Sequence, residues 1–600
     1  MSVLETPRIY FRGHVAWDPI TTNNWPKFYD ETDAETVYPT TVDKVKAFRE
    51  SAIAQVTATR NRSWNPHGTH RSKFYDSAVS GADCGAGLMT NDPFVGSPAN
   101  FMGMLVDLEP FGAFSSQLFF DAITFGIDGG YRILAPRTTR FTDRYINFNR
   151  TGIGAIAGVA SVVWQTAFPK NGGLRIDAFD SSVLQALQKA LEDDDVLGLT
   201  VQFNSYRTIY YDNRNAYQAA VMAAESAALQ VKLQGGGFQP NPARSPMVGV
   251  IGLWRKGEPS HEPCDRTLIT GPDDSQNAPT VADIHARLTN DTITLDLSNS
   301  ISEDDLDLTK HDFGTLSVVS VDSGGNAPVT LASFDYSQYD KSAYEATSGI
   351  LTLKLVAALP ADSTLQLRDA NNKILLAESA LRALPLVPNL YVNQNDPATA
   401  TFQVYDRGVY AGGGIDVTIC VMTSDGGTVL STFDVTTESD GTFSFPLRTS
   451  APGINAYVPL FGKKPPLPQQ GIDPMLYNYM YVRVLPTDAE LAALPPTWDN
   501  VYGKVLANWH AMAPCMDNWL DLGSEAQVRS FGTLLKKLTN AAAFEHFRYM
   551  PVTRDLTPGA RKLLYNFLDA PPAHEMLAAA APEEKPQTDF VELSKKMRSS

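Results

Sequence analysis

The chain has few cysteines and no long apolar run. Its 600 residues include four Cys, which lie far apart and form no CxxC pair. A disulfide framework needs paired cysteines, so we expect reduced and mostly buried thiols. No stretch approaches the roughly 18 apolar residues that cross a bilayer. Residues 1–13 lack the basic-then-apolar order of a secretory signal, so we expect a cytoplasmic protein.

Basic residues are in the minority. The chain has 49 Lys and Arg against 66 Asp and Glu, which gives a formal net charge of -17. Nucleic acids and anionic membrane surfaces are both bound by clustered Lys and Arg. Because no basic cluster offsets the acidic excess, the composition argues against a nucleic-acid partner and against a membrane partner.

The sequence also lacks the common catalytic signatures. It contains no GxSxG elbow, Walker loop, HExxH pair or Rossmann GxGxxG fingerprint. The glycine run 412–414 is more typical of a hairpin turn than of a phosphate-binding loop. The sequence therefore indicates no cofactor-binding motif and leaves any catalytic residues unknown.

Gly, Pro and short apolar segments are abundant instead. The chain has 42 Gly and 39 Pro, with 43% hydrophobic and only 19% charged residues. This composition favours a strand-rich and loop-rich protein over a helical bundle, and 600 residues are too many for one core. We predict a mainly β fold with added helices (α+β), built as a multidomain protein with antiparallel sheets or sandwiches and a C-terminal helical region.

One stretch combines a helix with a buried strand. Apolar residues in 183–191 recur at helical spacing, which predicts an amphipathic helix. The run 196–201 is apolar nearly throughout, as in a strand covered on both faces. A second apolar run at 247–254 is its expected neighbour in the sheet.

Changes in composition divide the chain into six segments. Proline and glycine break the pattern after the first third, alternating apolar residues dominate the middle, and helical spacing returns near the end. We predict, in order, a mixed α/β N-terminal domain, a linker, a β-rich domain, a small antiparallel β-sandwich, a helical region and a flexible tail. Their residues are 1–258, 259–278, 279–396, 397–485, 495–570 and 571–600.

A histidine pair is the local feature that most suggests chemistry. His67 and His70 are three residues apart with a glycine between them, and Asp76 follows. Two imidazoles at this spacing reach one metal ion if the loop folds back, and either Asp76 or a more distant carboxylate completes such a site. In the other interpretation His67 caps a turn and His70 packs beside Trp64. The sequence leaves both open.

Four short blocks resemble one known family. They are similar to the amino-terminal, non-ferritin half of the violacein-pathway iminophenyl-pyruvate dimer synthases, a group that includes the chromopyrrolate synthases. The resemblance covers roughly residues 1–395, and its most specific block is ALEDDDVLGLTVQ, residues 190–202. The other blocks are Pro7–Gly13, Asn65–Gly68 and Met247–Glu258.

The resemblance implies an oxidative coupling of two imine molecules derived from an aromatic 2-oxo acid, with iron or haem involved. In these relatives a ferritin-like carboxylate domain follows the β-rich half and uses paired Glu-x-x-His units on helices. This chain lacks such a pair. Glu545 and His546 are adjacent, so on a helix their side chains would diverge by about 100°.

We therefore expect a β-rich binding or scaffold subunit of a bacterial-type secondary-metabolite oxidative system. It would carry no cofactor itself and would act with a separate ferritin-like or haem-containing protein partner that holds the iron or haem. The rival hypothesis is a stand-alone oxidative imine-coupling or metal-dependent enzyme that uses His67 and His70. A third is a carbohydrate-binding or toxin-like β protein, because sandwiches support many such sites.

Overall fold

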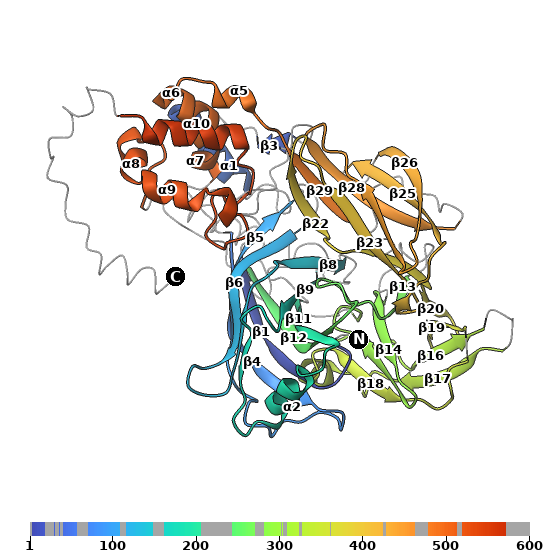
Figure 1. Cartoon of the computed structure of the whole chain (residues 1–600). Coiled ribbons are helices and arrows are strands. Elements are labelled where there is room, and N and C mark those ends of the chain that lie inside the picture. The colour runs from blue at the N-terminus through green and yellow to red at the C-terminus, as the bar shows by residue number, and fades with distance from the viewer. Residues whose placement is uncertain are drawn as a thin grey trace.

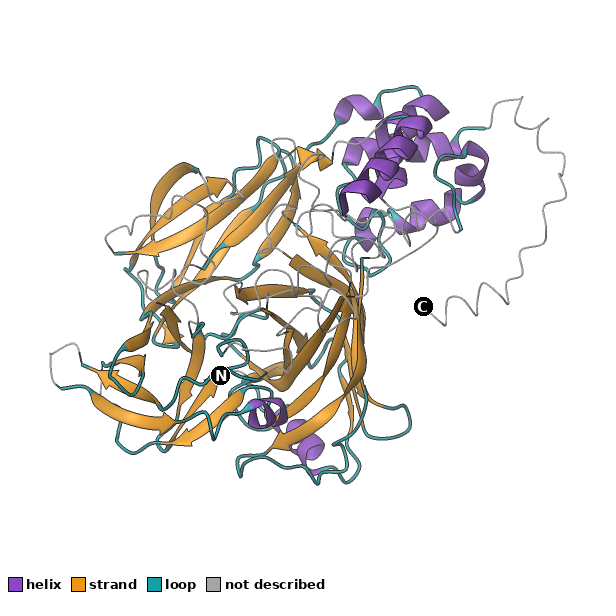
Figure 2. Ribbon diagram, turned by 180° about the vertical axis from the view of Figure 1, so that it is seen from behind, coloured by secondary structure: helices purple, strands orange, loops and turns teal. Residues whose placement is uncertain are grey.

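A computed structural model shows several β-sheets packed together and one helical region (Figure 1, Figure 2). The expected fold class, mainly β with antiparallel sheets, several domains and added helices near the C-terminus, is confirmed. The structure describes residues 3–17, 29–30, 35–36, 40–56, 70–108, 116–147, 161–205, 243–270, 281–301, 303, 309–322, 327–360, 362–423, 428–462, 478–512 and 519–571.

The largest sheet has ten strands and closes on itself. Its order is β10-β7-β6-β5-β4-β1-β12-β11-β9-β8, antiparallel at each pairing, and β6 also pairs with β8, where Gln117 lies opposite Thr142. We call this the closed sheet. Its strands are β1 (Arg8–Trp17), β4 (Arg71–Asp83), β5 (Ala99–Asp107), β6 (Ser116–Gly126), β7 (Arg132–Pro136), β8 (Phe141–Asn147), β9 (Ser161–Pro169), β10 (Arg175–Asp177), β11 (Val196–Ser205) and β12 (Ala243–Arg255).

Aromatic rings fill the interior of the closed sheet. Successive side chains of a strand point to opposite faces, so every second residue points inward. The ring of Phe203 lies 5.1 Å from that of Phe74 and 5.2 Å from that of Phe141. The predicted pairing of the two apolar runs is confirmed, because β11 lies between β9 and β12 and is buried along nearly all of its length.

The helix α2 (Ser182–Ala190) covers one end of this interior. The side chain of Ser181 accepts a hydrogen bond from the Leu184 amide, which satisfies one free donor of the first turn. Val183, Leu184 and Leu187 then bury their apolar face in the core of the closed sheet. The helix predicted for 183–191 is confirmed.

An eight-stranded sheet follows in the order β17-β16-β19-β20-β13-β14-β15-β18. Residues 266–270, which the sequence assigned to a linker, are instead strand β13, paired with both β14 and β20. Proline and glycine around this segment obscured its short apolar core. The elements are β13 (Arg266–Thr270), β14 (Ile284–Leu288), β15 (Thr292–Asp296), β16 (Leu316–Val321), β17 (Val329–Phe334), α4 (Lys341–Ala346), β18 (Ile350–Lys354), β19 (Thr364–Arg368) and β20 (Ile374–Glu378).

A sandwich of a four-stranded and a five-stranded sheet comes next, around one shared core. It begins at Leu381, earlier than the predicted residue 397, and the β22–β29 pair is parallel. Its strands are β21 (Leu381–Pro385), β22 (Asn389–Asn393), β23 (Thr399–Asp406), β24 (Val409–Tyr410), β25 (Asp416–Thr423), β26 (Val429–Thr436), β27 (Thr442–Pro446), β28 (Gly453–Phe461) and β29 (Met480–Leu485).

The helical region combines the C-terminal helices with one helix from near the N-terminus (Figure 1). Val45 and Phe48 of α1 pack among the apolar residues of the later helices. Among the helices described, none has the length and apolar character of a membrane span. The elements are α1 (Val42–Val56), α5 (Ala489–Ala492), α6 (Trp498–Val501), the π-helix Tyr502–Leu506, α7 (Ala507–Met512), α8 (Glu525–Ser530), α9 (Gly532–Leu538), the 3-10 turn Ala541–Ala543 and α10 (Pro558–Asp569).

A small sheet, the C-terminal tail and the cysteines complete the description. A small two-stranded sheet joins β2 (Tyr29–Asp30) to β3 (Glu35–Thr36). Of the predicted flexible tail, residues 572–600 lie outside the described residues. Cys264 and Cys420 are buried and Cys84 is exposed, and none of these three described cysteines forms a disulfide.

Candidate functional site

At the end of the closed sheet away from α2, the inward-facing side chains become polar. We call this the polar end and define it by Ser72, Asp107, Ser116, Asp143 and Trp164. Ser72 is near the start of β4, Asp107 ends β5 and Ser116 begins β6. Asp143 and Trp164 lie early in β8 and β9. Five strands thus bring together residues that are up to 92 positions apart (164 minus 72) in the chain.

Strand register places four of these side chains in one row. Asp107 lies opposite Ser116, and Asp143 lies opposite Trp164. The pairing of Gln117 with Thr142 brings Ser116 beside Asp143. The Ser116 hydroxyl donates to Asp107 Oδ1 at 2.5 Å. The row therefore holds two carboxyl groups with a hydroxyl between them, next to an indole ring.

Asp143 is the most unusual group in this row. Its side chain is 3% exposed, and no described residue stands in full hydrogen-bond geometry to either carboxyl oxygen, although the backbone amides of Ser116 and Asp143 lie close to the group. Burial raises the pKa of Asp143 well above its usual range, and the neighbouring Asp107 carboxylate adds to this. The backbone amides of Ser116 and Asp143 and the charge of Arg144 oppose the rise. The protein thus favours a neutral carboxylic acid here, which can both donate and accept a hydrogen bond.

Two further buried groups at the polar end have no partner. Within the described part of the chain, Trp164 Nε1 and Ser72 Oγ make no hydrogen bond, and both side chains are buried. By contrast, Trp17 Nε1 donates to Ser245 Oγ at 3.0 Å. Leaving a buried polar group unpaired costs about 1–3 kcal/mol. A ligand that pairs these groups would recover that free energy.

Aromatic rings surround these polar groups. The ring of Trp164 stacks on Phe203 with centroids 6.2 Å apart and meets Trp17 edge-on at 6.2 Å. The register that pairs Ala16 with Lys73 brings Trp17 close to Ser72. Aromatic faces and buried polar atoms without hydrogen bonds therefore occur together at the polar end.

One residue of the predicted metal site lies at the rim of this end. His70 immediately precedes β4, and its Nδ1 is 3.2 Å from the Leu105 carbonyl oxygen. Burial lowers the pKa of His70 to about 4; the Leu105 carbonyl opposes this and the charge of Arg554 adds to it. The imidazole is therefore neutral at pH 7.

The structure does not bring Asp76 to His70. Asp76 is exposed and lies six positions further along β4, a separation of roughly 20 Å in an extended strand. His67 lies outside the described residues. Among the residues described, no three His, Cys, Asp or Glu side chains gather as a metal-binding group. Metal binding by His67 with His70 stays a prediction.

The sequence analysis did not single out Asp107 or Asp143. A signal was present, since each occupies an inward position in a strand whose neighbouring inward residue, Leu105 or Phe141, is apolar. A carboxylate at such a position indicates either a pairing partner or a site. The closure of the sheet through β6 and β8 was needed to bring the two together.

We expect Asp143→Asn to stabilise the protein at neutral pH. A carboxyl group whose pKa is higher in the folded state costs stability as pH rises above its unfolded value near 3.9. Asn resembles the neutral acid and does not ionise. Urea unfolding at pH 7 should show a gain of about 1 kcal/mol or more, shrinking toward zero near pH 4. An equal gain at both pH values would contradict this account.

Comparison with known proteins gives one partial relationship. No protein family model matches the chain. The chain is 34% identical over 124 residues to 2-imino-3-(indol-3-yl)propanoate dimerase of Chromobacterium violaceum. This match covers 20% of the present chain and 9% of the dimerase. The chain therefore spans only a small part of the relative that it matches, and the similarity supports a suspected relationship.

Three solved structures show low similarity to the chain. The D0-D1 domain of intimin has a TM-score of 0.14 at 13% identity, with 32% of this chain and 90% of that chain covered. Domains 4 and 5 of the S-layer protein SbsC have a TM-score of 0.12 at 11% identity, with 37% of this chain and 98% of that chain covered. Salmonella alpha-2-macroglobulin has a TM-score of 0.14 at 12% identity, with 65% of this chain and 24% of that chain covered.

Proposed function

We propose that this chain is a β-rich binding subunit of a secondary-metabolite oxidative system. Its polar end holds a small aromatic ligand, and a separate ferritin-like or haem-containing polypeptide carries the iron or haem and performs the oxidation. The observation that carries this proposal is the group of buried polar atoms without partners, on Ser72, Asp143 and Trp164, between aromatic rings.

The partial similarity supports the same ligand class. The name of the Chromobacterium violaceum relative specifies an imino acid with an indole ring. A flat ring of this kind would pack against Trp17 or Trp164. The nitrogen and carboxylate of such a molecule would supply the donors and acceptors that Asp143, Ser72 and Trp164 lack.

The binding step can be tested with L-tryptophan, a stable amino acid with the same ring and carbon skeleton. Isothermal titration calorimetry should show saturable binding to the purified chain and none with L-leucine. Trp164→Phe keeps the ring but removes the N–H donor, and we expect it to weaken binding about tenfold. Trp254→Phe is the matched control, because Trp254 Nε1 donates to the Glu258 carbonyl oxygen outside this site. Absence of saturable binding to the parent protein would overturn the proposal.

The division of labour requires a second test. The purified chain alone should not couple aromatic imines oxidatively, whereas coupling should appear when a purified ferritin-like or haem polypeptide is added. Size-exclusion chromatography of the mixture should show co-elution of the two polypeptides. Turnover by the chain alone would contradict the subunit proposal and favour the enzyme hypothesis.

The rival proposal is a stand-alone metal-dependent enzyme using His67 and His70. One observation favours it: His70 lies at the rim of the polar end in its neutral form, which is the form that ligates a metal. Metal analysis of untagged protein tests it. Stoichiometric zinc or iron that is lost in His70→Ala would support the enzyme, while metal-free parent protein would reject it.

A further inference from the structure

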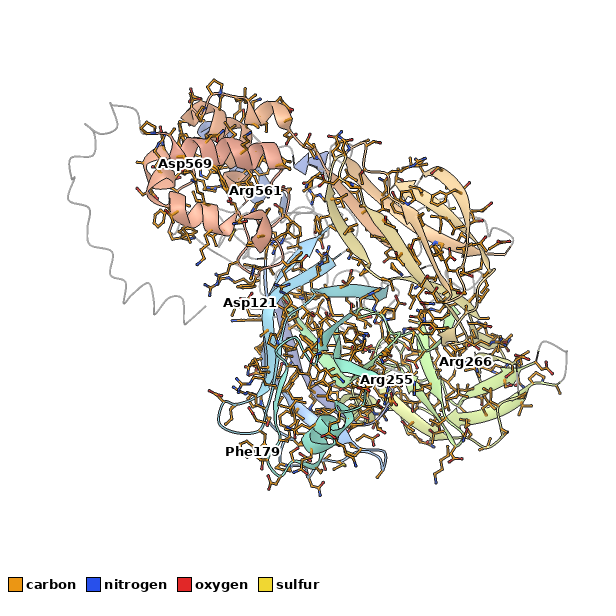
Figure 3. The ribbon with its side chains drawn as sticks, viewed as in Figure 1. Asp121, Phe179, Arg255, Arg266, Arg561 and Asp569 are labelled. Carbon is orange, nitrogen blue, oxygen red and sulfur yellow. The ribbon has the colours of Figure 1, made fainter. Side chains whose placement is uncertain are left out.

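A second buried polar cluster lies on the outer face of the closed sheet, where the helical region packs against it. We call it the arginine junction and define it by Arg137, Arg140, Arg554 and Glu545. The first two lie in the connection between β7 and β8, and the others lie between the turn Ala541–Ala543 and α10. Figure 3 labels Asp121 of β6 at this contact, where its Oδ1 accepts from the Phe547 amide at 3.4 Å.

Positive charge is in excess at the arginine junction. Arg137 Nη1 is 3.8 Å from Glu545 Oε2, and Arg140 Nη1 is 3.4 Å from Glu545 Oε1. The Glu545 side chain is 40% exposed and shared between the two guanidinium groups. Arg554 is fully buried, and its pKa is lowered to about 10, chiefly by burial, with a contribution from Arg140. The carboxylates of Glu545 and Asp121 thus face three arginines, which leaves one positive charge in excess in a chain whose net charge is -17.

Two of the arginines are held in place by contacts with aromatic rings and by hydrogen bonds from some of their N–H groups to backbone carbonyl oxygens. The guanidinium carbons of Arg140 and Arg554 lie 5.2 and 3.9 Å from the centroid of the Phe119 ring. Arg140 Nη2 donates to the Asn389 carbonyl oxygen at 3.1 Å. Arg554 donates from Nη1 and Nη2 to two backbone carbonyl oxygens at 2.9 and 3.0 Å. The positions of these side chains are therefore fixed before any ligand arrives.

Several donors of the arginine junction and of the adjoining Asn389 have no hydrogen-bond acceptor. Four buried nitrogen atoms make no hydrogen bond to a described residue: Arg137 Nε, Arg140 Nη1, Arg554 Nε and Asn389 Nδ2. Arg140 Nη1 has only its ion pair with Glu545 Oε1 at 3.4 Å. The polar end differs, since its unpaired atoms include the two carboxyl oxygens of Asp143. A cluster of unpaired donors with surplus positive charge calls for a ligand that brings acceptors and negative charge.

We propose that the arginine junction binds a small oxyanion, that is, a carboxylate or phosphate group. Guanidinium groups match such groups with parallel N–H···O bonds, and these bonds strengthen where water is excluded. The anion would accept from Arg137 and Arg140 and compensate the buried charge of Arg554. The Glu545 carboxylate pairs with the same two guanidinium groups, so it competes with the ligand.

The test uses the full chain and two probes, sodium phosphate and sodium acetate, each compared with sodium chloride at equal ionic strength. Thermal unfolding should show a saturable rise of the midpoint with phosphate or acetate, and the larger response identifies the preferred group. Arg137→Gln and Arg140→Gln should each weaken the apparent affinity about tenfold. Glu545→Gln should strengthen it several-fold, because it removes the competing carboxylate.

Arg132→Gln is the matched control. Arg132 lies on the adjacent β7 and is already paired with Asp128 and Asp177, so its loss should leave the anion affinity unchanged. Circular dichroism of each variant shows whether it folds. Because two arginine variants are measured, the proposal can still be tested if one of them does not fold. Equal effects of chloride and both oxyanions would overturn the proposal. The proposal would also be overturned if Arg132→Gln lost as much anion affinity as Arg140→Gln, or if Glu545→Gln weakened anion binding.

Discussion

We expect Gly198→Val to destabilise the protein by about 3 kcal/mol, at the upper end of ordinary overpacking costs. A Cβ atom at Gly198 would overlap the carbonyl oxygen of Phe168 on the neighbouring strand β9. That oxygen belongs to the backbone of a paired strand, so it cannot move aside without breaking the pairing of β11 with β9. The central part of the closed sheet should therefore lose cooperativity together with stability.

Urea unfolding followed by circular dichroism and tryptophan fluorescence measures this effect. Gly412→Ala is a suitable control, because a Cβ there meets no heavy atom within 4 Å. We expect that control to stay within about 0.5 kcal/mol of the parent protein. A Gly198→Val variant that unfolds like the parent would show that β9 and β11 do not pair as described.

Neutralising Glu262 is expected to have an effect of similar size. Glu262 is 5% exposed and accepts from Arg382, while Arg144 Nη1 lies 3.7 Å away and Asn478 donates at 3.2 Å. Arg144 belongs to the closed sheet, and Arg382 belongs to β21 of the sandwich. Glu262→Gln would leave two buried guanidinium groups without their carboxylate. Removing one partner from a buried ion pair costs about 3–5 kcal/mol.

The matched control is Glu345→Gln on helix α4. Glu345 pairs with the exposed Arg12 at 3.1 Å, and such pairs contribute about 0–1 kcal/mol. Urea unfolding of both variants gives the comparison. If Glu262→Gln costs no more than the control, the buried cluster does not hold the closed sheet and the sandwich together.

The sequence by itself determined the local elements with strong patterns. The helix α2 was readable because its apolar residues recur at helical spacing, and the structure adds the cap at Ser181. The strands β11 and β12 were readable because continuous apolar runs indicate burial on both faces. Gly198 lies within such a run, where a glycine is typical of a close backbone approach, and the Phe168 carbonyl oxygen of β9 makes that approach.

Only the tertiary structure decided which distant segments meet. The contact between β6 and β8 closes the large sheet and unites Asp107, Ser116 and Asp143, and periodicity within a strand carries no information about such a pairing. The arginine junction likewise joins residues near 140 to residues near 550. Helix α1 joins helices almost 450 positions later, because Val45 and Phe48 find their apolar partners there. Burial patterns show that a residue is covered, whereas packing of the whole chain decides by what.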